Sequence, residues 1–440
     1  MDLQKRLDEA ARRHDVPGAA VAVWTGTELV EAATGVLNRN TGVETTVDSL
    51  FQVGSTTKIW TATLVMRLVE EGLVDLDTPV REYLPEFGVA DPETSKAVTV
   101  RHLLTHTGGF DGDLFEDTGR GDDCVERYLE FLHGAGQAHP LGALFSYCNS
   151  GYVVLGALAA RFGGGTWEQT MRERLLEPLG VTHAALLPEE AILFRASAGH
   201  VGPDNAVHPG WQMPRSNAPA GSTMCLAPRE LVRFGRMFLD GGEGVLKAET
   251  IAAMTTPQVD VPGVPGLMAD RWGLGFELFD WGAPVFGHDG GTIGQSTFWR
   301  IIPGSGVTIA MSGNGGGFLG LIDEVALPVI RELTGLPVPA LPTPPERPER
   351  VDAAPYTGTY ATPAAVLEVT GADGGLDVTT VPGEYMARAG AERVTERYVH
   401  LSGQTFIKVK ADGGGHLPIT FVIEDGRAAY LHNGRAVPRA

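Results

Sequence analysis

The sequence predicts an α+β protein in two parts, a larger domain of mixed helices and strands followed by a small antiparallel β-barrel or sandwich. Three observations predict this fold class. Helical and strand periods alternate up to residue 336, a proline-rich stretch follows, and the remaining residues form short alternating runs punctuated by Gly, Asp and Asn. We therefore expect domains at 1–336 and 351–440, joined by a linker at 337–350.

The first domain opens with a helix and two strands. A charged amphipathic segment predicts a helix from Leu3 to about His14, and apolar runs at 18–24 and 28–34 predict strands around a Thr-Gly-Thr turn. In the segment 51–72, apolar residues then recur at helical spacing and end at a glycine. This segment predicts a largely apolar helix.

The rest of the first domain is less regular until its end. Residues 73–239 alternate short helices with Gly- and Pro-rich loops. Strand periods return at 286–314, where 296–302 and 307–312 flank a Pro-Gly-Ser-Gly turn, which predicts a hairpin. A helix from about 319 to 333 is expected to close the domain.

The prolines from 337 to 348 cannot belong to a helix, because proline lacks the N–H group and restricts the residue before it. This stretch predicts a stiff, extended linker. Beyond it we expect six or more short strands, among them 356–361, 365–370, 376–381, 405–409, 420–423 and 428–431.

The composition is that of an ordinary globular protein and excludes several kinds of partner. Of the 440 residues 43% are hydrophobic, and the net charge of −20 repels nucleic acid phosphates and anionic lipid headgroups. The three cysteines are widely spaced, which argues against a zinc site and against a disulfide framework. Without a signal peptide or a run of ~18 apolar residues, the sequence predicts a cytoplasmic protein with no nucleic acid or membrane partner.

The first chemical motif is Gly-Ser-Thr-Thr-Lys at 54–58, at the start of the apolar helix. The spacing of Ser55 and Lys58 places the hydroxyl and the amine on one helical face. A lysine can accept the serine proton only if its pKa falls well below ~10.4, and apolar surroundings can lower it. Taken alone, the pattern is more typical of an N-cap serine followed by a solvated lysine.

Two further motifs lie later in the chain. In the phrase at 145–152, Tyr147 and Asn149 point the same way if the chain is extended, so that a tyrosine phenolate can share a proton with Lys58 and the amide can hold a substrate carbonyl. In the phrase at 286–292, His288 supplies a polar or cationic group, and the Gly291 N–H can form an oxyanion hole with that of Ser55. A buried tyrosine, a helix-capping asparagine and a turn histidine are the alternatives for each motif by itself.

In this order the three motifs resemble the penicillin-binding protein and β-lactamase superfamily. The resemblance spans about residues 10–335 and is closest to the class C β-lactamase branch, with its D-peptidases, esterases and penicillin-binding-protein-type thioesterases. The phrases at 103–109 and 219–222 also resemble that branch. The resemblance implies a domain with an antiparallel sheet flanked by helices and a helical subdomain. The last part of the chain resembles, more weakly, the lipocalin-like barrel that some of these enzymes carry.

The resemblance implies a role for each residue of the three motifs. Ser55 becomes the nucleophile and Lys58 its proton acceptor, while Tyr147 becomes the partner acid or base and Asn149 a substrate-amide contact. His288 takes the place of the lysine that helps β-lactamases bind the β-lactam carboxylate. We therefore expect poor β-lactam hydrolysis and a closer likeness to the esterase, D-peptidase and thioesterase members.

The sequence does not support other catalytic arrangements. No G-x-S-x-G elbow of an α/β-hydrolase occurs. His102 and His106 have the i, i+4 spacing of metal ligands but no glutamate between them, which favours a structural role. We expect neither a metal ion nor a cofactor.

The sequence therefore predicts a serine hydrolase or acyltransferase that forms an acyl-enzyme on Ser55. The expected substrate is a peptidyl ester, thioester or amide with a D-residue, as in a peptide cyclase or D-peptidase, and the acyl donor can be thioester-activated or carrier-bound. The alternatives are a cytoplasmic carboxylesterase and a covalent acyl-accepting sensor that does not turn over.

Overall fold

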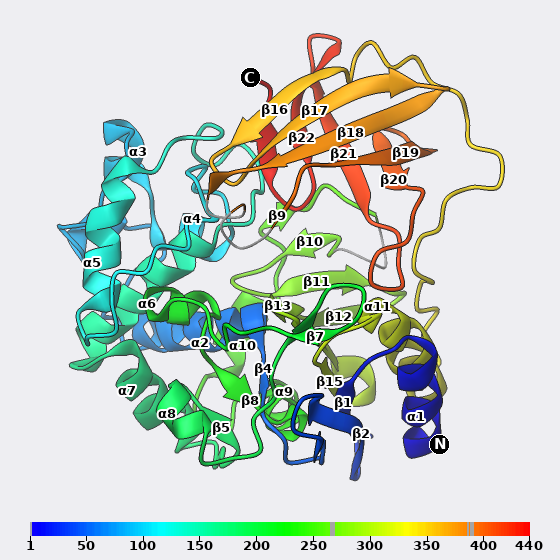
Figure 1. The fold of residues 1–440 in the computed structure, drawn as a ribbon. Coiled ribbons are helices and arrows are strands. Elements are labelled where there is room, and N and C mark those ends of the chain that lie inside the picture. The colour runs from blue at the N-terminus through cyan, green and yellow to red at the C-terminus, as the bar shows by residue number, and fades with distance from the viewer. Residues whose placement is uncertain (1, 265–268, 385–386, 388–390) are drawn as a thin grey trace.

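The computed structural model describes residues 2–264, 269–384, 387 and 391–440. In these residues a sheet-and-helix domain is followed by a C-terminal barrel that lies across its top (Figure 1). The fold class predicted from the sequence is confirmed.

In the described residues, the large sheet has the strand order β3-β2-β1-β15-β14-β12-β11-β10-β9, all antiparallel, with β13 paired to β14. The strands are β1 (Gly18–Trp24), β2 (Leu29–Asn38), β3 (Val43–Glu44), β9 (Val259–Asp260), β10 (Arg271–Trp272), β11 (Glu277–Asp280), β12 (Pro284–Gly287), β13 (Gly290–Thr292), β14 (Gln295–Ile302) and β15 (Val307–Gly313). Shorter strands β4 (Phe51–Gln52), β5 (Ala184–Ala185) and β8 (Cys225–Leu226) form a small sheet, and β6 (His200–Val201) pairs with β7 (Ala206–Val207).

Helices cover both faces of the large sheet and build a helical subdomain beside it. They are α1 (Leu3–Arg13), α2 (Thr57–Glu70), α3 (Pro92–Ala97), α4 (Val100–Leu104), α5 (Cys124–Phe131), α6 (Asn149–Gly163), α7 (Trp167–Met171), α8 (Pro188–Ala191), α9 (Pro228–Leu239), α10 (Ala248–Met254), α11 (Phe318–Leu321) and α12 (Leu327–Thr334). A 3₁₀ turn, η1 (Gly54–Thr56), leads directly into α2.

The alternation of strand side chains divides the core in two. On β1, Val21 and Val23 pack in the cluster that α1 and α12 cover, whereas Ala22 belongs to the cluster that contains Trp60 of α2 and Phe234 of α9. Both clusters are buried, so the central strands are apolar on both faces. The α2 helix is therefore held inside the protein, where its side chains exclude water.

The expected helix at 319–333 consists of α11 and α12 joined by a π-helical turn, Ile322–Ala326. Pro328 lies in the first turn of α12 and has no N–H to donate, which accounts for a widened turn just before it. The residues after α12 contain no helix or strand until β16. They pack on the first domain, since Val338 is buried and its carbonyl accepts hydrogen bonds from Arg331.

The C-terminal strands form an up-and-down barrel, in sequential order from β16 to β23 in the described residues. They are β16 (Gly358–Thr362), β17 (Ala365–Ala372), β18 (Gly375–Pro382), β19 (Val394–Ser402), β20 (Thr405–Lys408), β21 (Pro418–Glu424), β22 (Arg427–His432) and β23 (Ala436–Pro438). A bridge between Tyr360 and Arg439 and a hydrogen bond from Ala440 N to Thr359 O (2.9 Å) join the first strand to the end of the chain. These contacts leave the barrel nearly closed.

The barrel is fixed to the first domain by the turn between β22 and β23. Gly434 O accepts a hydrogen bond from Tyr147 N (3.0 Å), and Ala436 N donates to Ser146 Oγ (3.1 Å). His432 Nε2 lies 3.0 Å from Phe145 O. One turn of the barrel is thus bonded to the segment that leads into α6. No helix in the described residues has the length and apolar character needed to cross a bilayer.

Candidate active site

Ser55 lies in η1, one turn ahead of the buried part of α2. The preceding Gly54 has φ +55°, and a Cβ there would lie 2.5 Å from Gly291 N, so only glycine fits between η1 and β13. Gly221 (φ +115°) closes the other side, where a Cβ would lie 2.2 Å from Gly54 O. The serine is therefore held by close backbone packing on two sides.

Lys58 lies directly beneath Ser55. Its Nζ is 3.0 Å from Ser55 Oγ and donates a hydrogen bond to Ala220 O (2.6 Å), while the whole side chain is buried. Burial lowers the pKa of Lys58 well below its ordinary value, and the nearby Arg435 cation lowers it further. A neutral amine in contact with a serine hydroxyl can accept the hydroxyl proton.

Tyr147 stands on the other side of the amine. Lys58 Nζ lies 4.8 Å from the centre of the Tyr147 ring. Burial raises the pKa of Tyr147 well above its ordinary value, although a hydrogen bond with Ser55 opposes the shift. Burial therefore favours the neutral amine of Lys58 and the neutral phenol of Tyr147, whereas the sequence suggested a phenolate.

His288 follows β12 and faces Tyr147. Its Nε2 is 3.5 Å from Tyr147 Oη, and its Nδ1 contacts Asp289 O. Burial lowers the pKa of His288 to about 3, so the imidazole is neutral at physiological pH. The sequence left open whether His288 is a neutral polar group or a cation, and the structure favours the neutral group. With its Nδ1 proton given to a carbonyl, the ring presents Nε2 as an acceptor to the phenol.

Asn149 is the first residue of α6 and is buried. Its Nδ2 donates to Asp113 Oδ1 (2.7 Å), and the same carboxylate binds Arg435. Burial alone would raise the pKa of Asp113, but the Arg435 guanidinium holds it below its ordinary value. The amide is thus oriented by an ion pair that joins the two domains.

Gly291 lies in β13, next to Ser55. Both residues line a cavity of about 600 Å³, which also contains Tyr147 and His288, and a smaller one of about 140 Å³, which also contains Asn149. The structure therefore brings all six residues singled out by the sequence to one place, with Lys58 buried beneath Ser55. The roles of Ser55, Lys58, Tyr147, Asn149, His288 and Gly291 remain predictions.

Two charged residues of this site were not found from the sequence. Glu277, on β11, lines the larger cavity, and burial together with the nearby Asp289 raises the pKa of Glu277 to about 8. Arg435, on the barrel, lines both cavities. Neither lies in a recognisable motif, so no local signal pointed to them.

His102 and His106 use their Nδ1 atoms in hydrogen bonds within the protein. His102 Nδ1 caps α4 through Thr99, and His106 Nδ1 accepts a hydrogen bond from Cys148 N (2.9 Å). The described residues contain no group of three or more His, Cys, Asp or Glu side chains arranged to hold a metal ion, and Cys124, Cys148 and Cys225 are free.

Comparisons with known proteins identify one family. The family model described as "Beta-lactamase" matches residues 3–326. Penicillin-binding protein 4 of Amycolatopsis lactamdurans is 42% identical over 367 residues, which cover 81% of this chain and 96% of that protein.

Solved structures extend the likeness to the barrel. The crystal structure of SurE matches with a TM-score of 0.76 and 28% identity, covering 100% of this chain and 98% of that one, and a second SurE structure is titled as containing D-Leu. The D-amino acid amidase of Ochrobactrum anthropi SV3 matches with a TM-score of 0.59 and 26% identity, covering 71% of this chain and 90% of that one.

Proposed function

Because the chain belongs to the beta-lactamase family, we propose that it is a serine hydrolase or acyltransferase that forms an acyl-enzyme on Ser55 with a peptide-like substrate. One observation carries the proposal. Ser55 Oγ lies 3.0 Å from the Nζ of a lysine that is completely buried and whose pKa is lowered by that burial. A serine and a neutral amine in contact are what nucleophilic attack at neutral pH requires.

In the proposed first step, Ser55 Oγ attacks the substrate carbonyl and its proton passes to Lys58 Nζ. The carbonyl oxygen becomes an oxyanion, for which the N–H groups of Ser55 and Gly291 are the proposed donors. Tyr147, as a phenol, can give its proton to the leaving group and recover it from Lys58. The neutral His288 accepts the phenol hydrogen bond and so positions Tyr147.

The second step returns the enzyme to its starting state. Water or an amine gives up a proton along the same path and attacks the acyl carbon, which releases the acid or the amide. An amine supplied by the far end of the acyl chain would give a cyclic peptide, whereas water would give a linear acid. The cavity of about 600 Å³ above Ser55 has room for a peptide segment.

We further propose that the residue at the scissile carbonyl has the D configuration. Two similar proteins support this choice: SurE, of which one structure is with D-Leu, and the D-amino acid amidase. The leaving group is proposed to be an alcohol, a thiol or an amine. His288 in place of a lysine leaves no formal cation at that position to bind a β-lactam carboxylate, which favours these substrates over β-lactams.

The test is turnover of matched peptidyl thioesters that end in D- or L-leucine, with wild-type protein and Ser55→Ala. We expect many turnovers for the D-substrate, at least tenfold slower turnover for the L-substrate, and loss of both in Ser55→Ala. Mass spectrometry of the products separates hydrolysis from cyclisation. A single turnover followed by a stable acyl-Ser55 adduct would indicate a sensor instead. Equal rates for p-nitrophenyl butyrate and both peptides would indicate a general carboxylesterase.

A further inference from the structure

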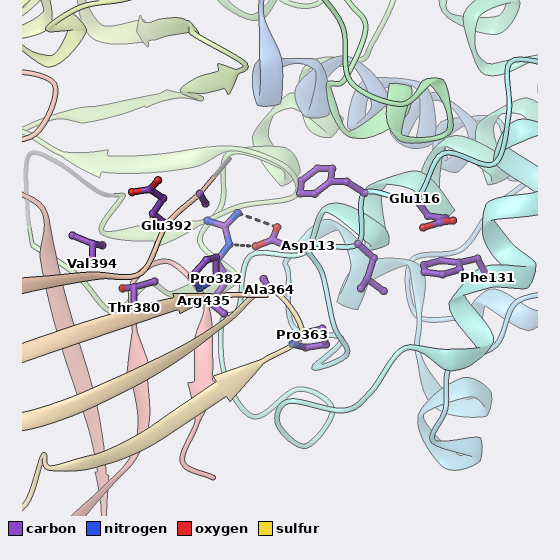
Figure 2. Close-up of a pocket in the computed structure, with 14 residues that line it drawn as sticks. Asp113, Glu116, Phe131, Pro363, Ala364, Thr380, Pro382, Glu392, Val394 and Arg435 are labelled. Atoms are coloured by element: carbon purple, nitrogen blue, oxygen red, sulfur yellow. Dashed lines mark hydrogen bonds and ion pairs between the residues drawn. The ribbon is translucent and has the colours of Figure 1, made fainter. Parts of the chain in front are cut away.

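A second cavity, of about 570 Å³, lies between the helical subdomain and the barrel, and Arg435 is one of its lining residues. Figure 2 shows Phe131 and Glu116 on the helical side, Thr380 and Val394 on the barrel side, and the Arg435–Asp113 ion pair between them. The cavity does not contain Ser55, so the proposed chemistry does not use it.

The cavity adjoins the cavities that contain Ser55, because they share lining residues. Arg435 lines this cavity and both cavities that contain Ser55, and Phe115 lines this one and the smaller of those two. A chain molecule bound with one carbonyl at Ser55 would reach the second cavity by passing Arg435.

The lining of the cavity is suited to apolar groups. Of the fourteen described residues that line it, nine are apolar. Its volume lies within the range of small-molecule sites, roughly 300–1,000 Å³. Phe131 and Val394 are 41% and 46% exposed, and they line it from different domains. Large apolar side chains left open to solvent on two sides of a concave site are typical of a surface that a ligand covers.

We propose that this interdomain cavity is a specificity subsite, which binds an apolar side chain of the peptide-like acyl group whose carbonyl is attacked by Ser55. The inference rests on the proposed function. The barrel then contributes to substrate selection in two ways, through Arg435 at the boundary and through the wall that contains Val394. Shortening the acyl chain would leave the cavity empty without changing the chemistry at Ser55.

The experiment compares an acetyl-D-alanine thioester with its extension by three leucine residues, using full-length protein. Burial of one leucine-sized side chain corresponds to roughly a tenfold to hundredfold gain in binding. We expect the extension to raise kcat/KM at least tenfold in the wild type. Val394→Asp, which places a charge in the subsite, should abolish most of this gain and leave the short substrate within about twofold of wild type.

Val409→Asp is the matched control, because Val409 is also a barrel valine, is 42% exposed and does not line the cavity. It should keep the full gain. Phe131→Ser changes the opposite wall of the cavity, so the subsite can still be tested if Val394→Asp does not fold. Leu73→Ser is the control for Phe131→Ser, because Leu73 is similarly exposed (44%) and does not line the cavity.

The outcomes separate the two proposals. If Ser55→Ala keeps turnover of the short thioester, the proposed function is wrong. If turnover depends on Ser55 but the gain from the leucines is the same in Val394→Asp, Phe131→Ser and the controls, only the subsite is wrong. A change in sedimentation mass on Val394→Asp, without a change in the gain, would show that a second copy of the chain covers these residues and would also overturn the proposal.

Discussion

The guanidinium of Arg435 on the barrel binds the carboxylate of Asp113 in the helical subdomain with two nitrogens, at 2.8 and 3.1 Å. The same guanidinium lies 4.8 Å from the centre of the Tyr147 ring. Both members of the pair act on Lys58, since the Arg435 cation lowers the pKa of that amine and the Asp113 anion raises it. The barrel therefore contributes to the electrostatics of the proposed catalytic residues.

The first prediction follows from the opposite effects of Arg435 and Asp113 on the pKa of Lys58. If the activity requires neutral Lys58, kcat/KM falls as the pH drops through the pKa of Lys58. Arg435→Met removes a cation and should raise that pKa, which moves the acid limb of the profile to higher pH. Asp113→Asn removes the anion and should move the limb to lower pH. Profiles with p-nitrophenyl acetate from pH 5 to 9 measure both shifts.

Arg397→Met is the control for the loss of a positive charge, because Arg397 pairs with Asp377 within the barrel. Its acid limb should coincide with that of the wild type. Shifts of Arg435→Met and Asp113→Asn in the same direction would contradict the electrostatic explanation.

The second prediction concerns the cost of burying Lys58. In the unfolded chain the amine has a pKa near ~10.4, and in the folded protein the pKa is lower because the side chain is buried. The unfolded state therefore binds this proton more tightly, so the folded protein loses stability as the pH falls below that value. Lys58→Met removes the effect. Its melting temperature should exceed that of the wild type, increasingly so as the pH falls from 9 toward the lowered pKa of the folded protein. Activity should fall by about three orders of magnitude or more.

Lys96→Met serves as the comparison, since Lys96 is exposed and pairs only locally with Glu93. It should show the wild-type pH dependence of melting and full activity. A Lys58→Met protein that is less stable at every pH would mean that the amine stabilises the fold, contrary to this account.

The sequence predicted the fold best where periodicity is strong. The helix at 3–14 and the hairpin at 296–312 agree with α1 and with β14 and β15 to within a few residues. The strand β19 was not predicted, because its alternating residues include Thr, Glu, Arg and His, which give little apolar contrast. The nearly closed barrel follows from pairing between Tyr360 and Arg439, which lie far apart in the chain.

In the candidate active site, too, the features set by local sequence could be predicted, and those set by contacts between distant residues could not. Ser55 and Lys58 are three residues apart in a helical segment, so local geometry alone brings them together. Arg435 reaches them from a turn almost four hundred residues later, through contacts such as Tyr147 N to Gly434 O. The pKa directions of Tyr147 and His288 depend on how deeply tertiary packing buries them. None of these features has a local sequence signal.

The third prediction concerns Glu277. Burial and the nearby Asp289 carboxylate raise the pKa of Glu277 to about 8, from an unfolded value near ~4.3. The folded state therefore binds this proton more tightly, and the resulting stabilisation is present below the unfolded pKa and is lost as the pH rises to about 8. Glu277→Gln keeps the shape without titrating, so its melting temperature should rise relative to wild type between pH 5 and pH 8.

Glu93→Gln, at an exposed carboxylate, should follow the wild-type melting curve throughout this range. A constant difference between Glu277→Gln and wild type from pH 5 to 8 would show that the Glu277 carboxyl is already ionised at pH 5. Thermal melts followed by circular dichroism at four pH values are sufficient to distinguish the two cases.

The last prediction tests the proposed oxyanion hole through Gly54, which lines neither of the two cavities that contain Ser55. Gly54 has φ +55°, and an added Cβ would lie 2.5 Å from Gly291 N, which belongs to backbone and cannot turn aside. Gly54→Ala should therefore displace β13 from Ser55 and separate the two proposed N–H donors. Loss of one such donor typically lowers kcat by about a hundredfold to a thousandfold, and we expect a fall of that size with p-nitrophenyl acetate.

Gly72→Ala is the control, because Gly72 has φ +70° and no atom lies within 4 Å of its added Cβ. It carries the same backbone strain, about 1 kcal/mol, without the clash, so it should lower stability slightly and leave kcat unchanged. Since the expected defect is in transition-state stabilisation, Gly54→Ala should reduce kcat much more than it raises KM. If Gly54→Ala and Gly72→Ala lose equal stability and both keep wild-type kcat, then close packing of η1 against β13 does not position the proposed N–H donors.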